Sequence, residues 1–264
     1  MLEIFARQML YPAPPVPVPS PPPAPLEEVW LDLSTGARAH AWAYTPPDLP
    51  DSAPIVVFFH GNGENLETLR WAGVFEEMGE LGVAVLAADF PGYGRSTGTP
   101  SEEAVMATGD AAVAWARTRH PERPVVVAGW SLGAALAIAT VDRHQEEVRG
   151  LIALSPWTTL AEVARGIFPE VAVRMMLKET YDSRSAARRI QVPALVVHGE
   201  MDDLIPVAQG KEIASVLAGP ARWVPVSRAA HNDLLGRREV WAAMAELLDE
   251  VRLSPSRHPQ DAER

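Results

Sequence analysis

The stretch Gly-Trp-Ser-Leu-Gly at residues 129–133 decides the fold predicted for this chain. It follows an apolar, β-branched run at 124–128 and precedes an alanine-rich run at 134–140 that is typical of a helix. A serine between two glycines at a strand-to-helix junction indicates a tight turn, which strains the serine backbone and exposes its hydroxyl above a sheet. A chance match is the alternative, and the position at this junction disfavours it. Ser131 is the predicted nucleophile.

A serine nucleophile needs an acid and a base, which follow it in the chain in the order Asp or Glu, then His. The strand-like run 193–197 leads into a loop that carries two adjacent carboxylates, Asp202 and Asp203. We predict Asp202 as the acid. Asp203 stays open as the alternative, because spacing alone does not tell which of two adjacent loop residues points toward the base.

The predicted base is His231, which follows the short apolar run 222–226. An unperturbed imidazole titrates near neutrality, so it can take the serine proton and return it to a leaving group while the acid fixes its tautomer. Five other histidines are predicted to be structural or surface residues: His40, His60, His120, His144 and His258.

Acyl transfer passes through an oxyanion, which needs two preorganised backbone donors. The amide of Leu132, directly after the nucleophile, is one predicted donor. The apolar run 54–59 ends in a glycine-rich loop at 60–65, whose backbone can approach a reacting carbonyl closely. We assign the second donor to the amide of Asn62 in that loop.

Five motifs together resemble those of α/β-hydrolases, closest to the serine-aminopeptidase-like branch that also holds protein-depalmitoylating thioesterases. They are His-Gly-Asn-Gly-Glu-Asn at 60–65, Asp-Phe-Pro-Gly-Tyr-Gly-Arg-Ser at 89–96, the turn at Ser131, the Asp202 loop, and His-Asn-Asp at 231–233. The resemblance covers roughly residues 26–253. It implies an eight-stranded, mostly parallel sheet with helices on both faces, and hydrolysis through a covalent acyl-enzyme.

The pattern of runs predicts the same α/β architecture, because strand-like and helical segments alternate from the third strand onward. The strand-like runs are 29–33, 37–44, 55–59, 83–88, 125–128, 151–154, 194–197 and 222–226. The helical runs are 66–81, 102–119, 132–144, 207–218 and 237–251.

A small helical cap is predicted at about 156–190, between the sixth and seventh strands. Its length leaves room for two or three short helices, which suggests a fairly open site. Trp130 and Trp157 are predicted to bind substrate, and Met175 and Met176 can adapt to varied apolar groups. Ordinary core packing is the alternative for these four side chains.

Composition indicates one catalytic domain at 26–253 with a segment before it and a polar tail at 254–264. The chain has 264 residues, 47% of them hydrophobic, and a formal net charge of -11. That charge argues against nucleic acid and anionic membranes as partners. The chain has no cysteine and no apolar run of about 18 residues, so neither a disulfide nor a transmembrane helix is predicted.

The N-terminal segment 1–25 contains a proline-rich stretch at 11–25 that is typical of extended polyproline II. We expect it to pack as an arm along its own domain or to form a homodimer. Residues 1–10 lack the uninterrupted apolar core of a secretory signal, and cytoplasmic residence is therefore predicted.

The predicted function is hydrolysis of carboxylic esters with small or medium acyl chains, without a metal or an organic cofactor. Thioester or amide hydrolysis on the same residues is the alternative within enzymes. The alternative that is not an enzyme is a binding protein built on a hydrolase fold. Such a protein would be expected to have lost one of the three catalytic side chains, and all three are present here.

Overall fold

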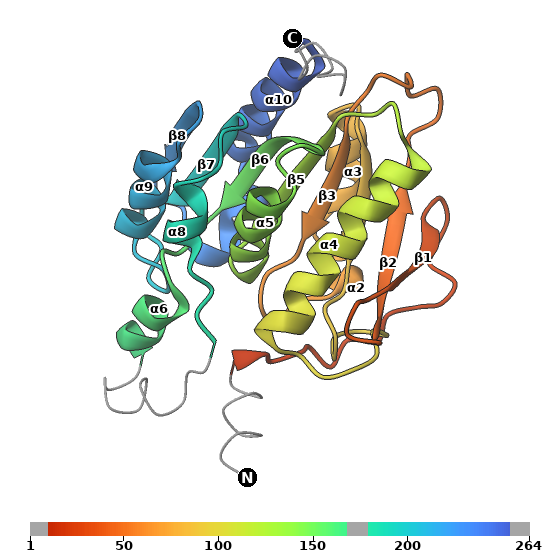
Figure 1. The fold of residues 1–264 in the computed structure, drawn as a ribbon, viewed down its shortest axis with the longest axis horizontal. Coiled ribbons are helices and arrows are strands. Elements are labelled where there is room, and N and C mark those ends of the chain that lie inside the picture. The colour runs from red at the N-terminus through yellow and green to blue at the C-terminus, as the bar shows by residue number, and fades with distance from the viewer. Residues whose placement is uncertain (1–9, 168–178, 254–264) are drawn as a thin grey trace.

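A single eight-stranded sheet runs through the computed structural model, which describes residues 10–167 and 179–253 (Figure 1). The strands are β1 (Glu27–Asp32), β2 (Arg38–Tyr44), β3 (Ile55–Phe59), β4 (Ala84–Ala88), β5 (Val125–Trp130), β6 (Val148–Leu154), β7 (Ala194–Gly199) and β8 (Ala221–Val226). Their order in the sheet is β1-β2-β4-β3-β5-β6-β7-β8. Strand β2 pairs antiparallel with both of its neighbours, and the pairs from β4 to β8 are parallel.

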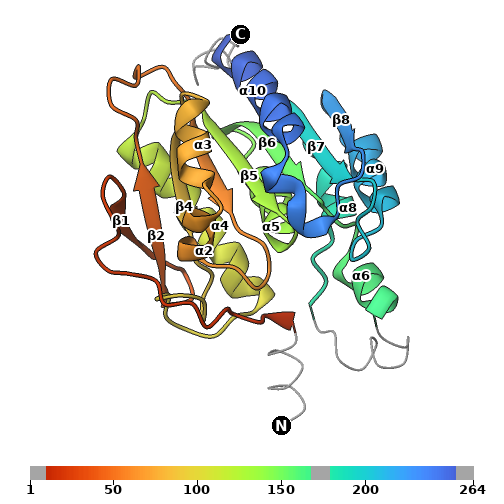
Figure 2. The ribbon, with the colours of Figure 1, turned by 180° about the vertical axis from the view of Figure 1, so that it is seen from behind.

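The central strands are short apolar runs because helices cover both faces of the sheet, so neither face of a strand meets water. Every residue of β3, β4 and β5 is buried. Helices α4 (Glu102–Arg119), α5 (Leu132–Arg143), α8 (Ser183–Ala187) and α9 (Val207–Val216) cover one face (Figure 1). Helices α2 (Leu66–Trp71), α3 (Val74–Glu80) and α10 (Arg238–Leu253) cover the other (Figure 2).

These layers confirm the predicted fold class, with one helix to correct. A single helix was expected over 66–81, but the chain forms α2 and α3 with a break between them. Gly73 lies in the break with φ of 75°, which is in the left-handed region. This conformation interrupts a right-handed helix, and residues other than glycine rarely adopt it. The apolar periodicity continues across this break and therefore conceals it.

The expected cap lies beyond the carboxyl ends of the strands. Helix α6 (Leu160–Ile167) lies there, and its Leu160 lines the same cavity as Leu10 and Tyr11 of the N-terminal arm (Figure 1). Helix α8 follows on the way back to the sheet. The cap residues Met175 and Met176, together with residues 1–9 and 254–264, lie outside the described residues. No helix in the described ranges combines the length and the apolar character that crossing a bilayer demands.

The N-terminal arm packs against its own domain. Tyr11 and Val18 are buried, each at 5% exposure, and they join the hydrophobic clusters on opposite faces of the sheet. The side chain of Asn65 donates a hydrogen bond of 2.8 Å to the carbonyl of Val16. Of the two packing modes expected for the arm, the structure contains the intramolecular one, and dimerisation through the arm stays a prediction.

Candidate active site

Ser131 lies in the turn between β5 and α5 with φ of 56° and ψ of -114°, a strained conformation for a residue with a side chain. The turn is so tight that its flanking glycines have no room for a Cβ atom. A Cβ on Gly129 would lie 2.0 Å from the carbonyl oxygen of Gly133, and one on Gly133 would lie 2.1 Å from the carbonyl oxygen of Phe59. The glycines of the motif are therefore required by the close approach of the backbone.

The structure brings the three predicted catalytic side chains into one chain of contacts. His231 Nε2 lies 3.1 Å from Ser131 Oγ, and His231 Nδ1 lies 2.7 Å from Asp202 Oδ2. All three residues are at least 92% buried, with exposures of 5%, 5% and 8%. Asp203, the alternative acid, is exposed to solvent and has no such contact with His231 among the described interactions.

Hydrogen-bond donors surround the carboxylate of Asp202. Its Oδ1 accepts the amides of Leu204 at 3.1 Å and Ile205 at 2.7 Å, and its Oδ2 accepts the hydroxyl of Ser155 at 3.0 Å. Burial by itself raises the pKa of Asp202, but the hydrogen bonds of His198, His231 and the Ile205 amide outweigh it and hold that pKa well below its usual range. This carboxylate is therefore ionised at every pH at which a hydrolase normally works.

Two residues at this carboxylate were missed by the sequence analysis. His198 lies near the end of β7 with Nε2 3.2 Å from Asp202 Oδ2, and Ser155 directly follows β6 with φ of 44°. Both stand at the carboxyl ends of parallel strands, where polar side chains of neighbouring strands meet. A position just after a predicted strand could have indicated both residues, and the prediction used it for Asp202 only.

The two predicted oxyanion donors, Asn62 and Leu132, both line the cavity beside Ser131. Leu132 is the first residue of α5, so its amide has no partner within the helix. The loop that carries Asn62 is held by a half-buried carboxylate, because Glu64 Oε2 accepts the amide of Gly61 at 3.1 Å. Burial raises the pKa of Glu64, although His60, the Gly61 amide and His231 oppose that rise.

His60 has no contact with the nucleophile among the described interactions. Its ring is fully buried, with Nδ1 2.8 Å from the carbonyl of Gly61 and Nε2 3.4 Å from Asp89 Oδ1. Asp89 in turn accepts the amide of Leu66, the first residue of α2. These contacts link the ends of β3 and β4 to the start of α2, in keeping with the structural role predicted for His60.

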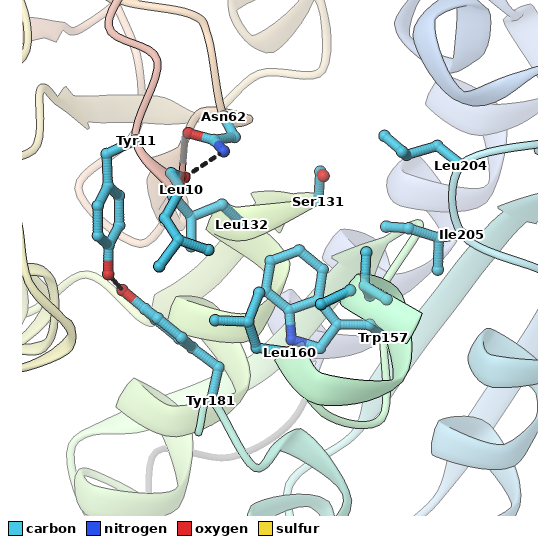
Figure 3. A pocket seen from close by; sticks show the side chains of 12 residues that line it. Leu10, Tyr11, Asn62, Ser131, Leu132, Trp157, Leu160, Tyr181, Leu204 and Ile205 are labelled. Carbon is cyan, nitrogen blue, oxygen red and sulfur yellow. Dashed lines mark hydrogen bonds between the residues drawn. The ribbon is translucent and has the colours of Figure 1, made fainter. Parts of the chain in front are cut away.

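A cavity of about 150 Å³ opens beside Ser131 (Figure 3). The residues that line it are mostly apolar: Leu10, Tyr11, Asn62, Ser131, Leu132, Trp157, Leu160, Val163, Ala164, Tyr181, Leu204 and Ile205. None of these residues carries a charge. The volume is close to that of an apolar cavity that admits benzene, about 150 Å³.

The two tryptophans predicted to bind substrate occupy different places. Trp157 lines the cavity, next to Leu160 (Figure 3). Trp130 is not among the lining residues. It packs against the imidazole of His231, with ring centroids 5.5 Å apart. Trp130 therefore supports the base in this structure, and Trp157 is the better candidate for substrate contact.

No cluster of three or more His, Asp or Glu side chains suited to a metal ion occurs in the described ranges.

Comparisons with known proteins agree with the fold. The sequence model of the alpha/beta hydrolase fold family matches residues 54–181. An uncharacterized protein of Mycobacterium tuberculosis is 32% identical over 251 residues, which cover 93% of this chain and 88% of that protein. The lysophosphatidylserine lipase ABHD12 of Xenopus tropicalis is 27% identical over 192 residues, covering 66% of this chain and 49% of that protein.

Among solved structures, the esterase Pf2001 of Pyrococcus furiosus superposes with a TM-score of 0.71 at 22% sequence identity, covering 90% of this chain and 98% of that one. The chain thus belongs to the α/β-hydrolase family, and this confirms the family resemblance found in the sequence.

Proposed function

We propose that this protein is a serine hydrolase that cleaves carboxylic esters of small or medium acyl groups through an acyl-enzyme intermediate. The observation that carries the proposal is the contact chain from Ser131 through His231 to Asp202, at 3.1 Å and 2.7 Å, beside an apolar cavity. These distances lie within reach of proton transfer.

In the proposed reaction, Ser131 Oγ attacks the ester carbonyl while His231 Nε2 takes its proton. The ionised Asp202 stabilises the resulting imidazolium, and the amides of Leu132 and Asn62 donate to the oxyanion. His231 then returns the proton to the departing alcohol. Water, activated by the same imidazole, hydrolyses the acyl-enzyme and regenerates Ser131.

Two features favour esters over amides. The described residues that line the cavity carry no charge that could anchor a peptide terminus or a charged side chain. Two of the similar proteins are named an esterase and a lipase. The cavity volume favours acyl groups of about the size of benzene, which include short alkyl chains.

The proposal is tested by measuring kcat/KM for p-nitrophenyl esters from acetate to decanoate, with Ser131→Ala as the blank. Thioesters and anilides of the same acyl groups are measured in parallel to distinguish the alternatives. We expect hydrolysis that depends on Ser131 and is fastest for esters with short or medium chains. An ester panel with no rate above the Ser131→Ala blank would contradict the proposal.

A further inference from the structure

The arm that precedes the sheet supplies one wall of the cavity beside Ser131. Leu10 and Tyr11 line the cavity although they lie more than a hundred residues before the nucleophile in the chain. They stand with Tyr181 on one side of it, and Leu204 and Ile205 stand on the other (Figure 3). The cavity is therefore closed on one side by a segment outside the α/β sheet.

Hydrogen bonds tie Tyr11 to the segment that precedes α8. Its hydroxyl donates to the carboxylate of Glu179 and lies 2.6 Å from the hydroxyl of Tyr181. Burial raises the pKa of both phenols, so they stay neutral and serve as hydrogen-bonding groups. The ring of Tyr181 in turn packs edge-on against Trp157, with centroids 6.2 Å apart. All three side chains line the cavity, and together they form what we call the aromatic wall.

A second attachment joins the arm to the loop that carries the proposed oxyanion donor. The side chain of Asn62 donates to the carbonyl of Leu10 at 2.6 Å and accepts the hydroxyl of Tyr93 at 2.5 Å. Both ends of this amide are thereby fixed, and the arm is held at the level of Ser131. The position of the arm is therefore determined by its contacts with Asn62, Glu179 and Tyr181.

We propose that the N-terminal arm is part of the acyl-binding site and that the ring of Tyr11 limits the length of the acyl group that the cavity accepts. This inference rests on the proposed function, because it names the specificity-determining residue of the same site. The acyl group lies between the aromatic wall and Leu204, and a longer chain meets the Tyr11 ring. Tyr11 takes no part in proton transfer.

The kinetic test compares p-nitrophenyl octanoate with p-nitrophenyl butanoate in the full-length protein. In Tyr11→Ala the ratio of kcat/KM for octanoate to that for butanoate is expected to rise about tenfold or more, since each methylene that gains an apolar contact is worth at least that factor. Tyr11→Phe keeps the ring and should stay within about twofold of the wild-type ratio. Equal shifts in both variants, or no shift in Tyr11→Ala, would overturn the proposal.

Two further variants separate this effect from loss of folding. Leu10→Ala opens the same wall while its backbone carbonyl still accepts from Asn62, so it should shift the ratio in the same direction. Tyr44→Ala removes a tyrosine at the other end of the sheet, where β2 pairs with the start of β4, and should leave the ratio unchanged. A ratio that changes equally in Tyr44→Ala would contradict a role specific to the arm.

Ester binding to the inactive Ser131→Ala variant can be measured without hydrolysis. Calorimetry with methyl butanoate and methyl octanoate is performed on Ser131→Ala and on Ser131→Ala with Tyr11→Ala. The added substitution should improve the affinity for the octanoate relative to the butanoate by about tenfold. The same ratio in both proteins, or no binding of either ester, would overturn the proposal. Failure of hydrolysis alone would instead contradict the proposed function.

Discussion

His198 Nε2 lies 3.2 Å from Oδ2 of Asp202, the same oxygen that His231 Nδ1 contacts at 2.7 Å. His198 is fully buried, and the same nitrogen lies 2.8 Å from the carbonyl of Ile205. Gly210 lies against the opposite edge of the ring, where a Cβ would be 2.3 Å from Nδ1. His198 is thus fixed in one orientation, in which it holds the carboxylate toward His231.

Replacing His198 should slow the reaction without weakening substrate binding. His198→Leu removes the polar contact of Nε2 with Asp202 Oδ2 and its hydrogen bond to the Ile205 carbonyl. Loss of a polar contact with a charged group is worth about 1.5 kcal/mol or about tenfold in rate, so kcat should fall while KM stays near its wild-type value. His198→Gln places a side-chain amide near the position of Nε2 and should restore much of kcat. Steady-state kinetics on both variants provide the measurement, and equal kcat values in wild type and His198→Leu would argue against this positioning role.

The two adjacent aspartates should differ sharply in their effect on activity. Asp202→Asn removes the charge that stabilises the imidazolium and alters the tautomer of His231, which should lower kcat by about 10⁴. Asp203→Asn changes an exposed side chain and should leave kcat within about twofold, making it the matched control. Kinetics with one p-nitrophenyl ester measure both. A larger loss in Asp203→Asn than in Asp202→Asn would reverse the assignment.

Glu64 should make the protein less stable as the pH rises. Its pKa is raised by burial above the ordinary value of 4.5, so the folded protein keeps a proton that the unfolded chain releases. The contribution of Glu64 to the free energy of unfolding is therefore present below about pH 4.5 and is lost as the pH rises through the raised pKa.

Glu64→Gln keeps an acceptor for the Gly61 amide but cannot ionise. Thermal unfolding followed from about pH 4 to about pH 7 should show a smaller loss of Tm in this variant than in wild type. Glu122→Gln, at an exposed loop position, is the control and should run parallel to wild type. Parallel curves for wild type and Glu64→Gln would show that this carboxyl does not titrate as described.

The nucleophile turn should not tolerate a methyl group. In Gly133→Ala the new Cβ would lie 2.1 Å from the carbonyl oxygen of Phe59, a backbone atom in a central strand that cannot move aside. We expect a loss on the order of 3 kcal/mol in the free energy of unfolding. Gly166→Ala in α6 is the control, because nothing lies within 4 Å of its added Cβ, and it should stabilise by up to about 1 kcal/mol. Urea denaturation compares the two variants, and equal midpoints would contradict the steric argument.

The central strands β3, β4 and β5 could be predicted because each is a short apolar run that is buried on both faces. The candidate site residues could be predicted because the nucleophile turn and the loops after the strands contain residue types with recognisable chemistry. The break at Gly73 was not predicted, because apolar periodicity continues across it.

Contacts between segments far apart in the chain could not be predicted from the sequence. Ser155 and His198 meet Asp202 only because β6 and β7 are neighbours in the sheet. Trp130 precedes the nucleophile, and the direction of its ring toward His231 depends on the turn geometry. Tyr11 reaches the cavity through the path of a proline-rich arm, for which the sequence contains no periodic signal.

The nucleophilic role of Ser131 is tested most directly by intact-protein mass spectrometry after treatment with a fluorophosphonate, followed by peptide mapping. We expect one adduct, located on Ser131, absent from Ser131→Ala and formed far more slowly in His231→Ala, since members of such a triad act as a unit. A wild-type protein that forms no adduct, or an adduct that persists in Ser131→Ala, would contradict Ser131 as the nucleophile.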